Sequence, residues 1–226
     1  MNGPIVQLKN IVKSFSGNHV FSGLDLDIKS NKITAIIGPN GCGKTTLFKI
    51  ILGITDKTGG DIIKPDNSNF GFMIDDILPY GHLNLYQNMT ALSKLSKKKI
   101  NRKQILQIIS DTFCDKIKSK PYKNLSSGQK RKAAFALTLL NDPEILILDE
   151  PLNSLDLKER IDIISAIKYM CKSHNKTVII SSHDLESLYE MCDEFCFIKE
   201  GRILSRFLKQ DISSDDLTSG YLKIYS

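Results

Sequence analysis

The stretch that decides the fold of this 226-residue sequence is Gly38-Pro39-Asn40-Gly41-Cys42-Gly43-Lys44-Thr45. It matches the phosphate-binding pattern G-x-x-x-x-G-K-[ST], and an apolar run at 33–37 enters it while a helical pattern at 46–52 leaves it. Glycines let the backbone wrap closely around phosphates, where N–H groups and the positive end of the helix dipole favour an anion. We therefore expect Lys44 to meet the β- and γ-phosphates of a nucleotide and the Thr45 hydroxyl to bind Mg²⁺.

A second stretch, residues 145–151, carries two adjacent acids after an apolar run. It reads Ile-Leu-Ile-Leu-Asp-Glu-Pro, so Asp149 and Glu150 follow a predicted buried strand, at the end where ligands bind in open α/β sheets. The simplest alternative for such acids is a helix N-cap. Because a phosphate loop lies upstream, we interpret Asp149 as a Mg²⁺ ligand and Glu150 as the general base that polarises an attacking water.

A third stretch, residues 125–129, reads Leu-Ser-Ser-Gly-Gln and precedes a predicted helix. Alone it is typical of an N-cap. In the order phosphate loop, 125–129, carboxylate strand, it makes the chain resemble the ATP-binding subunit of an ABC (ATP-binding cassette) transporter, over roughly residues 5–207. The usual family motif is L-S-G-G-Q, and Ser127 replaces its first glycine. The resemblance implies a head-to-tail dimer, in which the residues facing the ATP of the other subunit are Ser126, Ser127, Gly128, Gln129 and Asp156.

The resemblance also implies which residues bind and hydrolyse ATP. Phe15 matches the aromatic residue that stacks on adenine, with a strand core residue as the alternative, and His183, in Ser-Ser-His-Asp at 181–184, matches the switch histidine. Lys44, Glu150 and His183 are then the catalytic residues. The implied ATP-binding residues are Phe15, Gly38, Pro39, Asn40, Gly41, Cys42, Gly43, Lys44, Thr45 and Thr46.

The metal ligands implied by the motifs are Thr45, Asp149 and Asp75. Asp75 lies where the family generally carries a glutamine, and an acid there can ligate Mg²⁺ but lacks the amide donor. Asp76 is the alternative if the alignment shifts by one residue. An acid at this position is similar to bacteriocin-immunity and peptide-exporting branches of the family, in which a glutamate often stands there.

The apolar pattern predicts an α/β fold with a parallel sheet. Short apolar runs at 33–37, 145–148 and 178–180 are typical of buried parallel strands. The first thirty residues favour antiparallel strands, and the stretch 195–207 predicts a hairpin. With the resemblance, the expected class is a P-loop NTPase core with a mostly parallel sheet, an N-terminal antiparallel β subdomain and a helical insertion, of ABC ATPase type.

The helical patterns complete the expected organisation. Residues 157–171 place Leu157, Ile161, Ile164, Ile167 and Cys171 three or four apart, which predicts one apolar helix stripe. The lysine-rich stretch 83–124 lacks strand runs and predicts a helical lobe inserted in the core. No internal repeat or linker divides the chain, so we expect a single ABC ATPase domain over 1–226.

Composition narrows the class of protein. No apolar stretch approaches the roughly 20 residues of a membrane span, and the first residues, MNGPIVQLKN, show no secretion signal. Five cysteines, an odd number, favour reduced thiols in the cytosol. Cys42 either is tolerated as a small residue or has its thiol pKa lowered by Lys44 and the helix end, which would make it reactive. The net charge of +6 fits a phosphate ligand or a membrane-side face.

The resulting expectation is an ATPase that uses ATP and Mg²⁺ to drive transport, as a peripheral protein on the cytoplasmic face of the inner or plasma membrane. Its expected partners are a transmembrane permease on a separate chain and a second ATPase subunit, in a homodimer or heterodimer, with no nucleic acid. The acid at Asp75 favours export. The alternative is a soluble ABC ATPase in an assembly or cell-division role without transport.

Overall fold

The computed structural model describes residues 3–65, 69–73, 79–95 and 100–225. The strands are β1 Val6–Phe15, β2 Asn18–Ile28, β3 Ile33–Ile37, β4 Gly59–Ile63, β5 Phe70–Met73, β6 Ile145–Asp149, β7 Thr177–Ser181, β8 Glu194–Lys199 and β9 Arg202–Leu208. The helices are α1 Lys44–Leu52, α2 Leu85–Ser93, α3 Arg102–Asp111, α4 Ser127–Thr138, α5 Leu157–His174, α6 Leu185–Met191 and α7 Ser214–Tyr225, with 3₁₀ turns η1 Tyr122–Asn124 and η2 Lys209–Asp211. Within these ranges, no helix is long and apolar enough to cross a bilayer.

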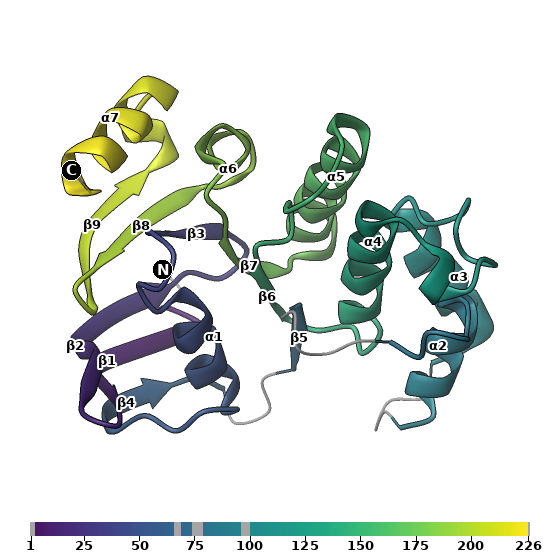
Figure 1. Ribbon diagram of the computed structural model, residues 1–226, viewed down its shortest axis with the longest axis horizontal. Coiled ribbons are helices and arrows are strands. Elements are labelled where there is room, and N and C mark those ends of the chain that lie inside the picture. Colours follow the sequence, from purple (N-terminus) through teal and green to yellow (C-terminus); the bar gives the residue numbers. More distant parts are fainter. Residues whose placement is uncertain (1–2, 66–68, 74–78, 96–99, 226) are drawn as a thin grey trace.

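The larger sheet brings the predicted site residues to one edge. Its strand order is β5-β6-β7-β3-β8-β9, and every pairing is parallel except that of β8 with β9. The three predicted buried strands are β3, β6 and β7, and the predicted hairpin is β8 with β9 (Figure 1). The predicted mostly parallel core is confirmed. Because β3, β6 and β7 run the same way, Gly38, Asp149 and Ser181 come to the same edge of the sheet.

Strands β1 and β2 form the predicted antiparallel pair, and β4 joins β1 on its other side, so the order in this sheet is β2-β1-β4. Its inner residues, such as Leu8 and Phe21, share one buried apolar cluster with Leu47 and Phe48 of α1. One glycine is required by close packing in this sheet. Gly60 has a φ of 83°, and a Cβ there would lie 2.2 Å from the carbonyl oxygen of Asn10. The small sheet thus packs on the helix that follows the phosphate loop.

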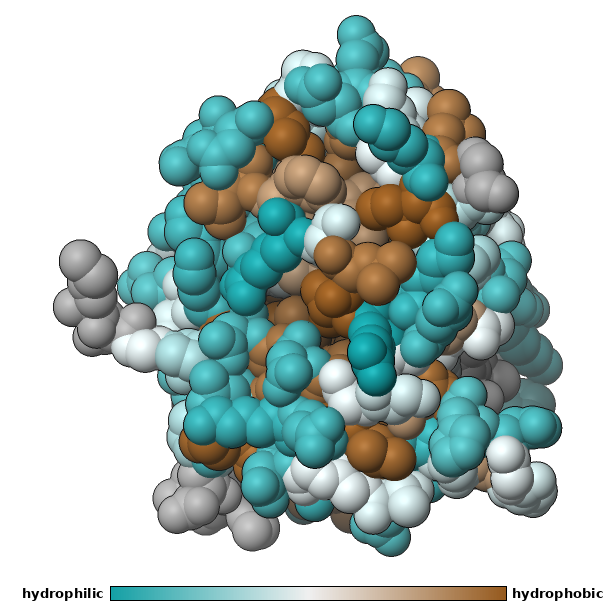
Figure 2. All heavy atoms as spheres, turned by 90° about the vertical axis from the view of Figure 1, so that its left-hand side faces the viewer, coloured by the Kyte–Doolittle hydropathy of each residue, from teal (hydrophilic) through white to brown (hydrophobic). Residues whose placement is uncertain are grey.

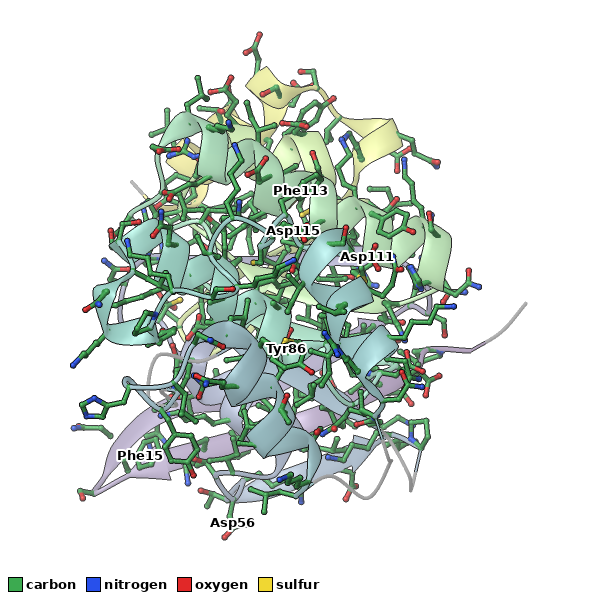
Figure 3. All side chains as sticks on the ribbon, turned by 90° about the vertical axis from the view of Figure 1, so that its right-hand side faces the viewer. Phe15, Asp56, Tyr86, Asp111, Phe113 and Asp115 are labelled. Atoms are coloured by element: carbon green, nitrogen blue, oxygen red, sulfur yellow. The ribbon has the colours of Figure 1, made fainter. Side chains whose placement is uncertain are left out.

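The predicted helical insertion is present and packs on α4, at the right of Figure 1. Both α2 and α3 begin with capping boxes, made by Asn84 with Gln87 and by Asn101 with Gln104. Figure 3 faces this lobe and shows Tyr86 on α2, below the segment that carries Asp111, Phe113 and Asp115. The buried apolar cluster of the lobe comprises Leu85, Met89, Ile105, Ile109, Cys114, Ile117, Tyr122, Leu125, Ala133, Ala136 and Leu140. Helix α4, which follows the 125–129 motif, therefore contributes to the core of the lobe.

The helix predicted at 157–171 is present within α5, but its predicted apolar stripe is wrong at the start. Leu157 is 73% exposed and Ile161 is 54% exposed, whereas Ile167 is fully buried. The buried residues of α5 begin at Ile163, because only from there does the helix lie against the core. Spacing alone identified the helix but not the point at which its apolar face meets the core.

We expect Ile167→Ala to lower the free energy of unfolding by about 2–5 kcal/mol, because the buried side chain would leave a cavity. The matched control is Ile161→Ala on the same helix. It is expected to change that free energy by less than about 1 kcal/mol, since most of the side chain already meets solvent. Urea unfolding of the nucleotide-free protein, followed by circular dichroism, measures both. Equal losses in the two variants would contradict the buried face assigned to α5.

Candidate active site

The phosphate loop, residues 38–43, connects β3 to α1 and is shaped by its glycines. Gly41 and Gly43 have φ values of 82° and 104°, which residues with a Cβ rarely adopt. A Cβ on Gly43 would lie 2.8 Å from Val20 Cγ1 and 2.9 Å from Phe21 Cε1, whereas one on Gly41 would have no atom of the described residues within 4 Å. The loop is therefore packed against β2 on one side and open at Gly41, where a ligand can reach backbone N–H groups.

The Lys44 ammonium is held inside the loop. Its Nζ donates to the carbonyl oxygens of Gly38 (2.7 Å) and Pro39 (3.1 Å), and the residue is only 7% exposed. The first turn of α1 contains no acidic residue of its own, and the positive end of its dipole faces the loop. A buried cation that faces carbonyl dipoles beside a helix N-terminus suits an anionic ligand such as phosphate.

Asp149 is held by hydroxyls from two other elements. Thr45 Oγ1 donates to its Oδ2 and Ser181 Oγ donates to its Oδ1, each at 2.5 Å. Mg²⁺ in phosphate sites takes oxygen ligands, commonly one or two carboxylates with phosphate and water oxygens. Thr45 and Asp149 therefore fit a Mg²⁺ ion beside the phosphate loop. Asp75, the third predicted ligand, and Asp76, its alternative, lie outside the described residues.

Glu150 and His183 lie within hydrogen-bond reach of each other. His183 Nδ1 is 3.1 Å from Glu150 Oε2, and the Glu150 side chain is 16% exposed. The φ of Glu150 is 48°, a left-handed value that costs a residue with a side chain about 1–3 kcal/mol. Two contacts hold this backbone in place. Its N–H donates to Ser181 Oγ at 3.0 Å, and the guanidinium of Arg131 donates to its carbonyl oxygen and, at 3.3 Å, to that of Asp149.

A pocket of about 270 Å³ opens between the phosphate loop and the carboxyl end of β6. Its lining residues are Asn40, Gly41, Gly43, Lys44, Thr45, Thr46, Asp149, Glu150 and Asn153. The structure thus brings together the predicted phosphate-binding, metal-binding and general-base residues. His183 reaches this group through its contact with Glu150.

The residues predicted to act across a dimer lie at the starts of α4 and α5. Ser126 Oγ accepts from the Gln129 N–H at 3.1 Å and Gln129 Oε1 accepts from the Ser126 N–H at 3.3 Å, a capping box. Asp156 caps α5 in the same way with Glu159. Gly128 is covered by Glu159, because a Cβ there would lie 1.7 Å from Glu159 Oε2. The two helix starts therefore meet where the Glu159 carboxylate lies against Gly128.

Only some of these five residues face solvent on one chain. Ser126, Ser127 and Asp156 are exposed, whereas Gly128 is buried and Gln129 is partly buried. None of the five is among the described residues that line the pocket. The structure therefore does not bring them to the pocket of their own chain.

Phe15 lies at the free end of the β1–β2 hairpin, near the edge of the molecule in Figure 3. Its ring is exposed, and Lys13 Nζ lies 4.3 Å from the ring centroid. Phe15 pairs with Asn18, two residues before Val20, which packs against Gly43. The alternative of a strand core residue is wrong, because a core side chain would be buried.

Of the two alternatives for Cys42, the one in which Lys44 and the helix end lower its thiol pKa is wrong. Burial raises the pKa of the Cys42 thiol above its ordinary value and outweighs the opposite effect of the Lys44 charge. The side chain is partly buried between Gly38 and the apolar cluster of the small sheet. A thiol pKa falls only where nearby positive charge outweighs the effect of burial, and at Cys42 burial has the larger effect.

Three residues of the site were not singled out from the sequence. Ser181 was predictable in principle, because it pairs with Asp149 in the parallel register of β6 and β7. Asn153 lines the pocket and lies just beyond the carboxylate strand. Arg131 had no local signal, because its contacts with the Asp149 and Glu150 carbonyls depend on how α4 packs against the end of β6.

Comparisons with known proteins agree with this geometry. A model of the ABC transporter family matches residues 21–153. The chain is similar to the lantibiotic transport ATP-binding protein SrtF of Streptococcus pyogenes, with 32% identity over 210 residues, which cover 88% of this chain and 89% of that protein.

Solved structures share the fold over nearly the whole chain. One is cbiO1 from Clostridium perfringens, part of the ABC transporter complex cbiONQ, with 27% identity and a TM-score of 0.82 over 99% of this chain and 96% of that chain. Another is a dimeric, post-hydrolysis ATP-binding cassette bound to ADP and Pi. It has 22% identity and a TM-score of 0.80 over 90% of this chain and 98% of that chain.

We expect Cys42 to react slowly with iodoacetamide at neutral pH and faster as the pH rises, because the thiolate is the reactive form and the thiol pKa is raised. Peptide mapping by mass spectrometry, at several values between about pH 7 and about pH 10, gives the rate at each cysteine. The urea-unfolded protein is the control and is expected to react faster at Cys42 throughout. Faster labelling of Cys42 in the folded protein at neutral pH would contradict the raised pKa.

Proposed function

Since this chain belongs to the ABC transporter family, as an ATP-hydrolysing subunit, we propose that it drives export of a substrate through a separate transmembrane permease. The observation that carries the proposal is the pocket where Lys44, Thr45, Asp149 and Glu150 meet, which matches the chemistry of ATP hydrolysis. The similarity to a lantibiotic transport ATP-binding protein supports transport and favours export. We keep residues 1–226 as one domain with the lobe 83–124 inserted, because the lobe shares an apolar cluster with α4.

We assign ATP binding to the phosphate loop, Thr46 and the exposed ring of Phe15. Lys44 would exchange its bonds with the Gly38 and Pro39 carbonyls for bonds with β- and γ-phosphate oxygens. Thr45 and Asp149 would hold Mg²⁺, with Asp75 as a candidate further ligand. When bound, that ion neutralises charge that develops on the transferred phosphoryl group.

Glu150 is the residue we assign as general base. Both carboxylate oxygens of Asp149 already accept hydroxyl hydrogen bonds and would serve the metal, so Asp149 is less suited to take a proton. Glu150 lines the pocket, and His183 Nδ1 contacts its Oε2. In this assignment Glu150 accepts the proton of the attacking water. His183 orients the Glu150 carboxylate and contacts the γ-phosphate of bound ATP.

The exposed helix starts at Ser126 and Asp156 support a dimer in which each chain completes the pocket of the other. The first turn of α4 has no acidic residue of its own, and its dipole favours a phosphate. The Glu159 carboxylate, which lies against Gly128, would have to swing aside for a phosphate to bind there. A similar cassette is known as a dimer bound to ADP and Pi. We propose that Ser126, Ser127, Gly128, Gln129 and Asp156 face the ATP held by a second ATPase subunit. The dimer closes on ATP because the nucleotide contacts both chains, and it reopens when hydrolysis removes those contacts.

The proposed location is the cytoplasmic face of the inner or plasma membrane, where the lobe 83–124 would dock on the permease. The lobe lies at the far end of the molecule from α7 (Figure 1) and packs on α4, whose N-terminus carries the Ser126 segment. Movement of that segment on dimer closure would therefore be passed to the lobe. This arrangement links ATP binding to movement of a membrane partner.

We expect Glu150→Gln to bind ATP but to lose ATPase activity by about a hundredfold or more, because the amide cannot accept the proton of the water. In ATP and Mg²⁺ this variant is expected to elute as a dimer in size-exclusion chromatography. Glu144→Gln is the matched control: it changes an exposed acid at the opposite end of β6 and should keep full activity. A monomeric Glu150→Gln protein with full activity would contradict the assignment.

We further expect the tagged chain to co-purify with a protein of several membrane spans when it is expressed in its native cells and the membranes are extracted in mild detergent. In reconstituted vesicles this partner should change the ATPase rate, since the lobe couples the two. The Glu150→Gln protein should bind the same partner but show no turnover. A soluble scaffold protein as the stoichiometric partner, with no membrane protein, would instead support an assembly role.

A further inference from the structure

Helix α7 ends against the strand that enters the phosphate loop. The hydroxyl of Tyr225 lies 2.9 Å from the carbonyl oxygen of Ile37 and 2.9 Å from that of Ile198, and its single proton is donated to one or shared by both. Ile37 is the last residue of β3 and immediately precedes Gly38. A side chain from residue 225 thus reaches the backbone at the start of the loop.

The same contact joins two neighbouring strands at their carboxyl ends. Strand β3 pairs with β8 in parallel, with Ile37 opposite Phe197, so the two carbonyl groups that meet Tyr225 come from adjacent strands. The ring of Tyr225 lies 6.3 Å from that of Phe197, measured between centroids. The Tyr225 hydroxyl therefore links β3 and β8 at the point where β3 ends and the phosphate loop begins.

The group around Tyr225 extends to the ligand-binding side of the loop. A Cβ on Gly38 would lie 2.8 Å from Ile198 Cγ2, 2.9 Å from the Ile198 carbonyl oxygen and 2.6 Å from Cys42 Sγ, so these residues are closely packed. The Gly38 carbonyl, one residue from the Ile37 carbonyl, accepts from Lys44 Nζ at 2.7 Å. A shift of the Ile37 peptide would therefore move the carbonyl that holds Lys44.

Helix α7 is itself firmly attached to the core, so it can serve as a fixed support. Leu217 is 1% exposed and belongs to the main core cluster, against which Tyr221 and Tyr225 also pack. Lys199 Nζ donates to the Ile224 carbonyl at 2.6 Å, which places a positive charge at the negative end of the helix dipole. Figure 2, which faces the side of β9 and α7, shows apolar side chains gathered near its centre within a polar rim.

The Tyr225 hydroxyl remains a proton donor. Burial raises its pKa, and the nearby Cys42 thiol adds a smaller effect in the same direction.

We propose that Tyr225 is a positioning residue of the nucleotide site: its hydroxyl holds the Ile37 peptide, and so sets the loop that carries Lys44. The proposal rests on the proposed function of that loop in ATP binding. In this proposal α7 does more than pack against the core: through Tyr225 it raises the affinity of the loop for the nucleotide.

The test compares Tyr225→Phe, which removes the hydroxyl and keeps the ring, with Tyr221→Phe. The control removes a hydroxyl from the same helix that makes neither of the two carbonyl contacts. We expect Tyr225→Phe to weaken binding of a fluorescent ATP analogue about three- to tenfold, the effect of one lost hydrogen bond. The KM for ATP should rise with it, while kcat at saturating ATP changes less than about twofold.

A second readout is independent of nucleotide. Release of the Ile37 peptide should loosen the contact of Gly38 with Cys42, so iodoacetamide should label Cys42 faster in Tyr225→Phe and at the native rate in Tyr221→Phe. This labelling tests the positioning role even if the native protein failed to bind ATP, which would instead overturn the proposed function. The two failures are therefore distinguishable.

The proposal is overturned if Tyr225→Phe keeps native ATP affinity and native Cys42 labelling, even with a lower Tm, because α7 would then only add stability. Equal effects of Tyr225→Phe and Tyr221→Phe would overturn it as well. If Tyr225→Phe does not fold, Lys199→Met replaces it, since that change frees the end of α7 and keeps Tyr225. It should shift ATP affinity and Cys42 labelling in the same directions, and native values in both would reject the proposal.

Discussion

The site depends on one interaction: the two hydrogen bonds that the Thr45 and Ser181 hydroxyls donate to the Asp149 carboxylate. Thr45 comes from the helix after β3, Asp149 ends β6 and Ser181 ends β7, so this one side chain ties three elements together. Parallel strands make the arrangement possible, because their carboxyl ends share an edge of the sheet. These two hydrogen bonds hold both oxygens of Asp149. The carboxylate of the next residue, Glu150, is the one that contacts His183.

Contacts from two other elements hold the Glu150 backbone in the conformation that points its side chain toward His183. A left-handed φ for a glutamate persists only where the surroundings fix it, and here Ser181 holds its N–H while Arg131 holds its carbonyl. Arg131 belongs to α4, the helix that begins at the Ser126 segment. The position of the proposed base is therefore linked, through one arginine, to the helix whose start we assign to the partner's nucleotide.

The parts that could be predicted from the sequence are those fixed by local pattern. The loop at 38–45, the strands before Gly38 and Asp149, and the order of the motifs each depend on neighbouring residues, and together they gave the fold and the main pocket residues. The sequence did not predict features that depend on packing. The burial that raises the pKa of Cys42, the exposure of Leu157 and Ile161, and the contacts of Arg131 and Tyr225 all depend on elements distant in the chain.

The contact of Glu159 with Gly128 extends this reasoning to the dimer. Glu159 belongs to the capping box of Asp156, and its carboxylate lies where a Cβ of residue 128 would be. A side chain in place of the glycine of the Leu-Ser-Ser-Gly-Gln motif would therefore displace the Glu159 carboxylate within the same chain, whatever the glycine contacts in another. This contact places the Asp156 segment directly against the Ser126 segment. In the proposed dimer, a change at the Asp156 segment would reach the Ser126 segment, then α4, and through Arg131 the proposed base of the same chain.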